Sequence, residues 1–180
     1  MEHNATGLEI ERKFTLNWIP DNLDEYKCID IEQAYLCTAP VVRIRREDDE
    51  YYLTYKGSGL RSRTEYNLPL DEESYNHLKG KADGNIITKK RYIIPLDSLD
   101  FSQREPDPDG ADETPKPNPY VGLIAEFDVF DPPFDDLMIA EVEFPDIETA
   151  DRFNPPEWFD EDVTMKYEYH NSYLSKKKII

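Results

Sequence analysis

Several residue types are scarce in this 180-residue sequence, and each shortage excludes a class of protein. Cys28 and Cys37 are the only cysteines, and they form neither a CxxC motif nor the framework of a disulfide scaffold. No apolar run approaches the roughly 20 residues of a membrane-spanning helix, and the N-terminus lacks the apolar core of a signal peptide. These absences favour a soluble, cytoplasmic protein.

Positive charge is also in short supply, because 21 Lys and Arg residues stand against 39 Asp and Glu residues. The net charge of −18 predicts that the protein binds neither nucleic acid nor membrane surfaces, since both require an excess of basic residues. An anionic ligand stays open if the basic residues gather in one place. The three histidines lack ligand spacing and are expected on the surface, and the sequence contains no P-loop, dinucleotide-binding glycine pattern or nucleophile elbow.

The chain is rich in short segments that alternate charged and apolar residues, which is the pattern of β-strands. In the first of them Glu9, Glu11 and Lys13 occupy every second position, with Ile10 and Phe14 between them. Strands are predicted over residues 8–16, 29–37, 41–46, 51–56, 61–68, 86–96, 123–130 and 137–144. Helices are predicted over residues 22–26, 71–80, 146–153 and 167–178. Residues 1–180 are expected to form a single domain, interrupted by a proline-rich acidic loop at about 97–122.

The charged faces of these strands have two interpretations. An ordinary antiparallel sheet would turn them to water and bury the apolar face. A closed barrel would enclose them in a water-filled lumen and pack its apolar outside against helices. We favour the barrel, because paired Arg and paired Glu residues recur on strand after strand where a solvated face would carry varied small polar residues.

The signs of the charges differ from strand to strand. Acidic residues lie on the first, seventh and eighth predicted strands, and basic residues lie on the third, fourth and sixth. Closure of the sheet would place a wall of carboxylates opposite a wall of bases. An oxygen-rich cluster suits a hard cation such as Mg²⁺ or Mn²⁺, and the bases suit a polyanion, so the pattern predicts phosphoryl-transfer chemistry.

These segments resemble the triphosphate tunnel metalloenzymes of the CYTH superfamily. The similarity begins at residues 9–14, EIERKF, which match the family's ExExK signature, and it continues in order over nearly the whole chain. The further matching segments are QAYL at 33–36, RIR at 43–45, LTYKG at 53–57, RTE at 63–65, KKRY at 89–92, EFDVF at 126–130, AEVE at 140–143, and DVT at 162–164 before Asn171. The resemblance implies an α+β, mainly β fold: an eight-stranded antiparallel barrel with a charged lumen and a few flanking helices.

The resemblance also implies roles for individual residues. The implied metal ligands, for Mg²⁺ or Mn²⁺, are Glu9, Glu11, Glu126, Asp128, Glu141 and Glu143. The implied substrate-binding residues are Lys13, Arg43, Arg45, Lys56, Arg63, Lys89 and Arg91. Lys13 and Tyr35 are the implied catalytic residues, with a tunnel-lining role as the alternative for Tyr35.

The expected function is metal-dependent hydrolysis of a triphosphate-bearing small molecule. Inorganic triphosphate is favoured as substrate because the chain resembles the short bacterial inorganic triphosphatases and shows no pocket specific for a base. The alternatives are an adenylate cyclase or thiamine triphosphatase of the same superfamily, or a non-catalytic module that binds polyphosphate. All acidic motif positions are filled, which favours catalysis. The oligomeric state is left open, with a homodimer as one option.

Overall fold

The computed structural model describes residues 7–20, 22–98 and 120–178. All of its strands belong to one antiparallel sheet. The strands are β1 (Gly7–Leu16), β2 (Lys27–Thr38), β3 (Val41–Glu47), β4 (Glu50–Lys56), β5 (Ser62–Leu70), β6 (Asp83–Pro95), β7 (Ile124–Phe130), β8 (Met138–Glu143) and β9 (Phe159–Asp162). The eight predicted strands are therefore confirmed, and β9 is an addition.

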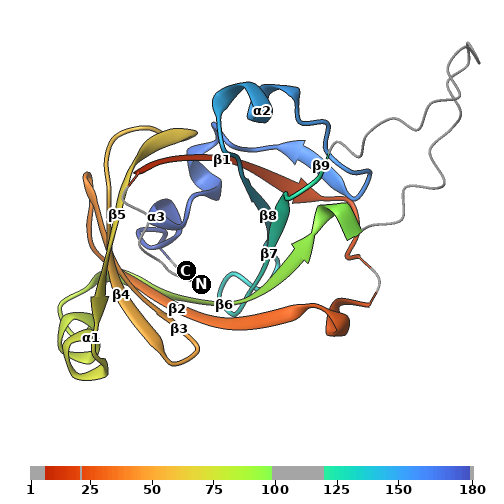
Figure 1. Ribbon diagram of the computed structural model, residues 1–180. Coiled ribbons are helices and arrows are strands. Elements are labelled where there is room, and N and C mark those ends of the chain that lie inside the picture. The colour runs from red at the N-terminus through yellow and green to blue at the C-terminus, as the bar shows by residue number, and fades with distance from the viewer. Residues whose placement is uncertain (1–6, 21, 99–119, 179–180) are drawn as a thin grey trace, which may run out of the picture.

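The first strand closes the sheet into a barrel (Figure 1). Its beginning pairs with β5, with Glu9 opposite Arg63, and its middle pairs with β8, with Glu11 opposite Glu143. Neighbours around the ring run β1, β5, β4, β3, β2, β6, β7, β8 and back to β1. The last residues of β1 pair with β9 instead, so β9 lies outside the ring of eight.

Two short helices, α1 and α2, flank the barrel on its outside (Figure 1). Helix α1 (Glu72–Lys79) begins where the Asp71 side chain accepts a hydrogen bond from the Ser74 backbone N–H at 2.7 Å. Its buried Tyr75 packs against Ile44, which points outward from β3. Helix α2 (Ile147–Arg152) is capped in the same way by Asp146. In the described part of the chain, no helix is long and apolar enough to cross a membrane.

The apolar residues of the alternating strands face outward and form the main core between the barrel and its covering segments. Phe14 of β1 contacts Phe159 of β9 with ring centroids 4.7 Å apart, and Phe153 follows α2 and lies 5.1 Å from Phe144. Trp158 packs edge-on against Phe159. This arrangement is the reverse of a soluble sandwich, and it leaves the charged faces for the interior.

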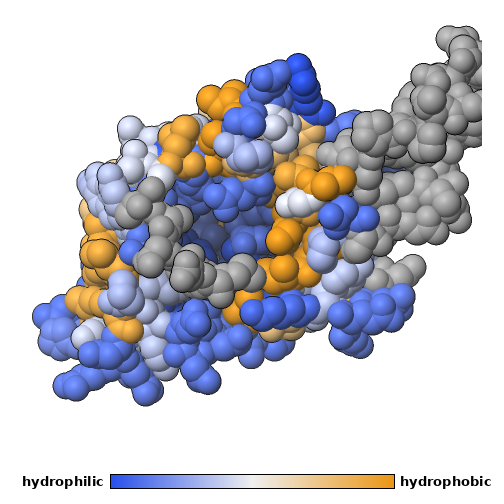
Figure 2. Space-filling model, in the orientation of Figure 1, coloured by the Kyte–Doolittle hydropathy of each residue, from blue (hydrophilic) through white to orange (hydrophobic). Residues whose placement is uncertain are grey.

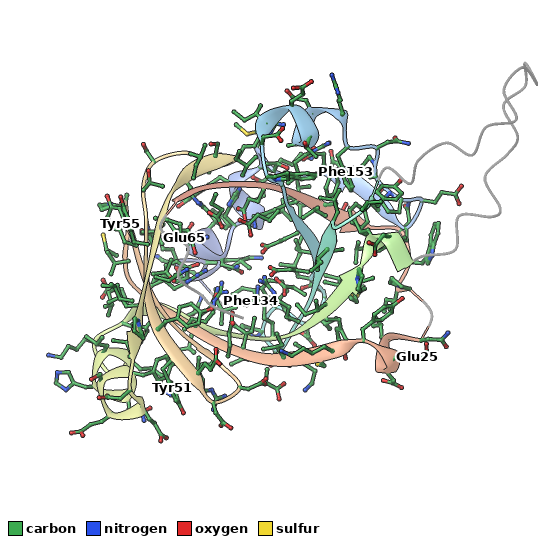
Figure 3. All side chains as sticks on the ribbon, viewed as in Figure 1. Glu25, Tyr51, Tyr55, Glu65, Phe134 and Phe153 are labelled. Atoms are coloured by element: carbon green, nitrogen blue, oxygen red, sulfur yellow. The ribbon has the colours of Figure 1, made fainter. Side chains whose placement is uncertain are left out.

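A second apolar cluster closes one end of the barrel. It contains Ile87, Phe130 and Ile139 from the strands, Phe134 (labelled in Figure 3), and Leu174 from helix α3 (Asn171–Leu174). The predicted helix over residues 167–178 is wrong in extent. The chain forms a 3₁₀ turn at Tyr167–Tyr169, becomes extended at His170 (φ −85°, ψ 138°), and only then forms the four residues of α3.

The predicted loop at 97–122 falls largely on residues 99–119, outside the described part. Before it, Leu96–Ser98 form a 3₁₀ turn, and the Leu96 N–H donates to the Leu123 carbonyl at 2.9 Å. After it, Tyr120 is buried in the main core, 1% exposed, which the composition of the loop did not indicate.

Replacing Tyr120 with phenylalanine is expected to destabilise the fold modestly. The Tyr120 hydroxyl donates to the Asn154 carbonyl at 2.7 Å, and losing such a bond costs about 1 kcal/mol. Urea unfolding of Tyr120→Phe measures this loss, and the exposed Tyr66→Phe serves as control. Equal free energies of unfolding for the two variants would show that the hydrogen bond contributes nothing.

Candidate active site

The charged side chains of the strands line a tunnel inside the barrel. Glu65 of β5, labelled in Figure 3, points into it, whereas Tyr55 of the neighbouring strand points outward. The predicted site residues that line the tunnel are Glu9, Glu11, Lys13, Tyr35, Arg43, Arg45, Lys56, Arg63, Arg91, Glu126, Glu141 and Glu143. Lys89 and Asp128 point the same way but are buried and do not line it.

The tunnel consists of a wide and a narrow cavity that share lining residues, among them Arg43, Arg45 and Arg91. The wide cavity, about 530 Å³, opens at a mouth lined by Glu143 and by the β3–β4 hairpin. The narrow cavity, about 80 Å³, ends against residues that begin α3. Figure 2 shows the hollow lined by hydrophilic side chains, with hydrophobic residues around it on the outer surface.

Carboxylates of β1, β8 and β7 lie side by side because these three strands are neighbours in the sheet. Glu11 lies directly opposite Glu143, and Glu126 lies directly opposite Glu141. Like charges in such cross-strand pairs repel each other, so the arrangement requires cations nearby. The carboxylates of the expected acidic wall therefore lie close together.

Bases from β4 and β5 form ion pairs with some of these carboxylates. Arg63 donates to Glu9 at 2.9 Å and to Glu11 at 3.1 Å, and Lys56 contacts Glu9 at 2.6 Å. Lys56 also contacts Glu65 at 2.6 Å. The acidic and basic residues of this half of the tunnel thus interlock and do not stand apart as two separate walls.

A second ion cluster surrounds Arg91 of β6. Its guanidinium donates to both oxygens of Asp128 at 2.7 Å, to Glu141 at 2.9 Å, and to Glu126. Lys89 also pairs with Asp128, whose carboxylate is fully buried. Since both Asp128 oxygens are taken by bases, this carboxylate holds Lys89 and Arg91 in place.

Glu141 lies between the two clusters. It pairs with Lys13 on one side and with Arg91 on the other. Burial alone would raise the pKa of Glu141, but Lys13 and Arg91 outweigh it and hold the pKa well below its usual range. Glu141 is therefore ionised and joins the residues near β1 to those near β6.

Glu143 differs from the other acids of the wall. Within the described ranges its carboxylate makes no ion pair or hydrogen bond, although it lies among several acids at the wide mouth. Partial burial, together with the charges of Glu9 and Glu126, raises the pKa of Glu143 to about 7. A cation at this point would relieve the repulsion.

The two expected catalytic residues lie at the narrow end. Burial raises the pKa of Tyr35, although Arg43 and Arg45 oppose the shift, so the phenol is protonated. Burial lowers the pKa of Lys13, but Glu11 and Glu141 outweigh it and raise the pKa above its usual range. Lys13 is therefore protonated at neutral pH.

His170 also reaches the narrow end, which corrects the expectation of a surface position. It is 4% exposed, and its Nε2 lies 2.9 Å from the Thr164 carbonyl oxygen, so Nε2 carries a proton. Burial and nearby Lys13 lower its pKa, which favours the neutral ring. The sequence carried no signal for this position, because it depends on the turn at residues 167–169.

Sequence reasoning also did not identify Glu47 as a residue that contacts Arg45. Glu47 continues the alternation of Arg43 and Arg45 one residue beyond the predicted strand, and it accepts a hydrogen bond from Arg45 at 2.9 Å. Burial alone would raise the pKa of Glu47, but Arg45 and the Tyr52 hydroxyl lower it to about 2.

This depressed pKa predicts an acid-dependent loss of stability. Ionised Glu47 stabilises the fold above its unfolded pKa of about 4.5, and the contribution is lost as the pH falls towards about 2. We expect the difference in unfolding free energy between wild type and Glu47→Gln to shrink over that window. Urea unfolding at several pH values measures it, and a difference independent of pH would contradict the assignment.

The donor set suits a hard divalent cation, because the acids of β1, β7 and β8 offer only carboxylate oxygens. Over the described residues, however, no three His, Cys, Asp or Glu side chains are arranged to hold a metal ion as they stand. The ion pairs explain this, since Lys and Arg draw most of the carboxylates towards themselves. The residues therefore fit a divalent cation in chemistry. The Glu143 carboxylate, which has no ion-pair partner among the described residues, can bind a cation without first breaking an ion pair.

Comparisons with known proteins agree with this geometry. A CYTH domain matches residues 7–117. An inorganic triphosphatase of Nitrosomonas europaea is 33% identical over 170 residues, which cover 93% of this chain and 96% of that protein. An inorganic triphosphatase of Acetivibrio thermocellus is 28% identical and covers 94% of each chain. The crystal structure of the inorganic triphosphatase NE1496 superposes with a TM-score of 0.62 at 31% identity, covering 94% of this chain and 95% of that one. The chain belongs to the CYTH domain family.

Proposed function

We propose that this protein is a metal-dependent triphosphatase that hydrolyses inorganic triphosphate. The observation that carries the proposal is the closed barrel whose lumen holds bases and carboxylates in contact with each other. The triphosphatase relatives support the substrate, since they match nearly the full length of the chain. We further propose a cytoplasmic location, and a homodimer stays a prediction.

The bases of the tunnel are the proposed substrate-binding residues. Guanidinium groups bind phosphate with paired hydrogen bonds, and ammonium groups add charge. Arg43 and Arg45 line both cavities, so a phosphate chain lying along the tunnel would meet them in its middle. The full proposed set is Lys13, Arg43, Arg45, Lys56, Arg63, Lys89 and Arg91, of which Lys89 acts from behind the tunnel wall.

The carboxylates are the proposed metal ligands. We assign Glu9, Glu11, Glu141 and Glu143 to the tunnel surface, with Glu126 at the mouth and Asp128 buried behind Arg91. A bound Mg²⁺ or Mn²⁺ would neutralise charge on phosphate oxygens and make water a better nucleophile. The specific ion is part of the proposal.

Metal and substrate are expected to bind cooperatively, each raising the affinity for the other. A triphosphate competes with Glu9 and Glu141 for their Lys and Arg partners, and a divalent cation competes with those bases for the carboxylates. When both bind, each side chain exchanges one partner of opposite charge for another, so no buried charge is left unpaired. Either ligand alone would leave such a charge.

Lys13 and Tyr35 are proposed to act on the reacting phosphate. Because Lys13 keeps its proton, it stabilises negative charge on the transferred phosphoryl group and does not serve as a base. Tyr35 keeps its proton as well, so it donates a hydrogen bond either to the phosphate or to a neighbouring side chain. Both roles proposed for Tyr35 stay open.

Thermal unfolding tests the cooperative binding of metal and triphosphate. A ligand that binds only the folded state raises the Tm. We expect triphosphate together with Mg²⁺ or Mn²⁺ to raise it by more than the sum of the two separate shifts, because each ligand pairs the charges that the other leaves unpaired. Identical melting curves with and without both ligands at millimolar concentration would contradict the proposed site. ATP and thiamine triphosphate in parallel test the alternative substrates.

A further inference from the structure

Neighbouring side chains of the tunnel wall hold the guanidinium of Arg45 at two of its nitrogens, Nε and Nη1. Its Nε donates to the Gln33 Oε1 at 3.2 Å, and its Nη1 donates to Glu47 at 2.9 Å and to the Tyr52 hydroxyl oxygen at 3.2 Å. The Tyr52 hydroxyl in turn donates to Glu47. The four residues are buried, between 0% and 9% exposed.

The protonation states of this group are fixed by its surroundings. Burial raises the pKa of Tyr52 to about 12, with Arg45 opposing the shift, so Tyr52 remains a donor. The low pKa of Glu47 keeps its carboxylate charged next to Arg45. Arg45 Nε can only donate, which fixes Oε1 of Gln33 towards it and directs the Gln33 Nε2 away.

One nitrogen of Arg45 is left for a ligand. Across the described ranges, Nη2 has no hydrogen-bond partner, and Arg45 lines both the wide and the narrow cavity. The guanidinium is thus fixed at Nε and at Nη1, and Nη2 remains as its donor for a ligand in the tunnel. Gln33 Nε2 is a second buried donor that has no partner among the described residues.

We propose that Glu47 and Tyr52 are positioning residues, which orient Arg45 so that its Nη2 meets the phosphate chain. This inference rests on the proposed triphosphatase function. Holding a flexible arginine in its productive geometry before substrate arrives removes an entropic cost, and a misplacement of about 1 Å can lower a rate about 100-fold.

The alternative is that Glu47 and Tyr52 merely stabilise the barrel. A matched network on the outside of the barrel separates the two roles. There Glu32 accepts hydrogen bonds from the Tyr75 hydroxyl and from Lys79, each at 2.9 Å, with no tunnel residue involved. Glu32→Gln and Tyr75→Phe therefore make the same chemical changes away from the substrate.

A double-mutant cycle on triphosphate hydrolysis tests the proposal. We expect Glu47→Gln to lower kcat/KM about 10-fold or more, and Tyr52→Phe to lower it less, because Glu47 remains. In an Arg45→Ala background neither substitution should change kcat/KM by more than about 2-fold, since the residue they orient is gone. Glu32→Gln and Tyr75→Phe should leave kcat/KM unchanged whatever they do to the Tm.

Two other outcomes overturn the proposal in different ways. If wild type is active but the losses from Glu47→Gln and Arg45→Ala multiply, Glu47 does not act through Arg45 and the positioning role is wrong. The same conclusion follows if Glu47→Gln lowers the Tm without changing kcat/KM. If wild type neither binds nor hydrolyses triphosphate with Mg²⁺ or Mn²⁺, the proposed function fails, and this inference fails with it.

Discussion

Replacing Glu143 with glutamine is expected to lower kcat for triphosphate by at least about 100-fold while the Tm stays the same or rises. The substitution keeps the shape of the side chain but removes a charge that the proposed cation needs. The fold should not suffer, because Glu143 has no ion-pair partner in the described part of the chain. Its raised pKa means that ionised Glu143 is disfavoured in the fold above its unfolded pKa.

Steady-state kinetics and thermal unfolding of the same preparation measure both effects. Glu148→Gln is the control, since the Glu148 side chain is exposed and pairs with Arg152 on α2, away from the tunnel. Near-wild-type turnover of Glu143→Gln at limiting metal would show that the acidic wall is not the metal site. Loss of folding would show that Glu143 has a structural role.

The second large effect is expected at Asp128, and it concerns stability. Asp128→Ala would leave the buried cations of Lys89 and Arg91 without their main partner. Removing one partner from a buried ion cluster typically costs 3–5 kcal/mol, so we expect about that loss in unfolding free energy. Urea unfolding of the purified variant measures it.

A matched surface pair provides the control for Asp128. Lys90 is the residue after Lys89 on β6 and pairs with Asp30 at 2.7 Å, with both side chains at least half exposed. Asp30→Ala should cost at most about 1 kcal/mol, because water replaces the lost partner. Equal losses for the two variants would contradict the distinction between buried and exposed pairs.

The strands of this fold were predictable because each alternates charged and apolar residues, and β1 with Glu9, Glu11 and Lys13 is typical. The barrel closure followed from the number of such strands. Strand β9 was not predictable, because its four residues, FDED, are too few and too acidic to show a period. It forms because its backbone pairs with the end of β1.

The residues that face the tunnel were predictable from the sequence, but the ion pairs between them were not. Alternation placed Glu11 and Lys13 on one face, whereas the contact between Arg63 and Glu11 depends on how β5 closes onto β1. Register between strands distant in sequence is set by the whole barrel. For the same reason His170 was misplaced, since the turn before it determines where its ring lies.

Phosphate release from inorganic triphosphate, ATP and thiamine triphosphate, each measured with Mg²⁺, with Mn²⁺ and with chelator, tests the central claim most directly. We expect that inorganic triphosphate is hydrolysed fastest, that chelator abolishes the reaction, and that Glu143→Gln slows it by at least about 100-fold. Faster turnover of ATP or thiamine triphosphate would contradict the proposed substrate. Absence of phosphate release from all three with either metal would contradict the claim that the tunnel is a triphosphatase site.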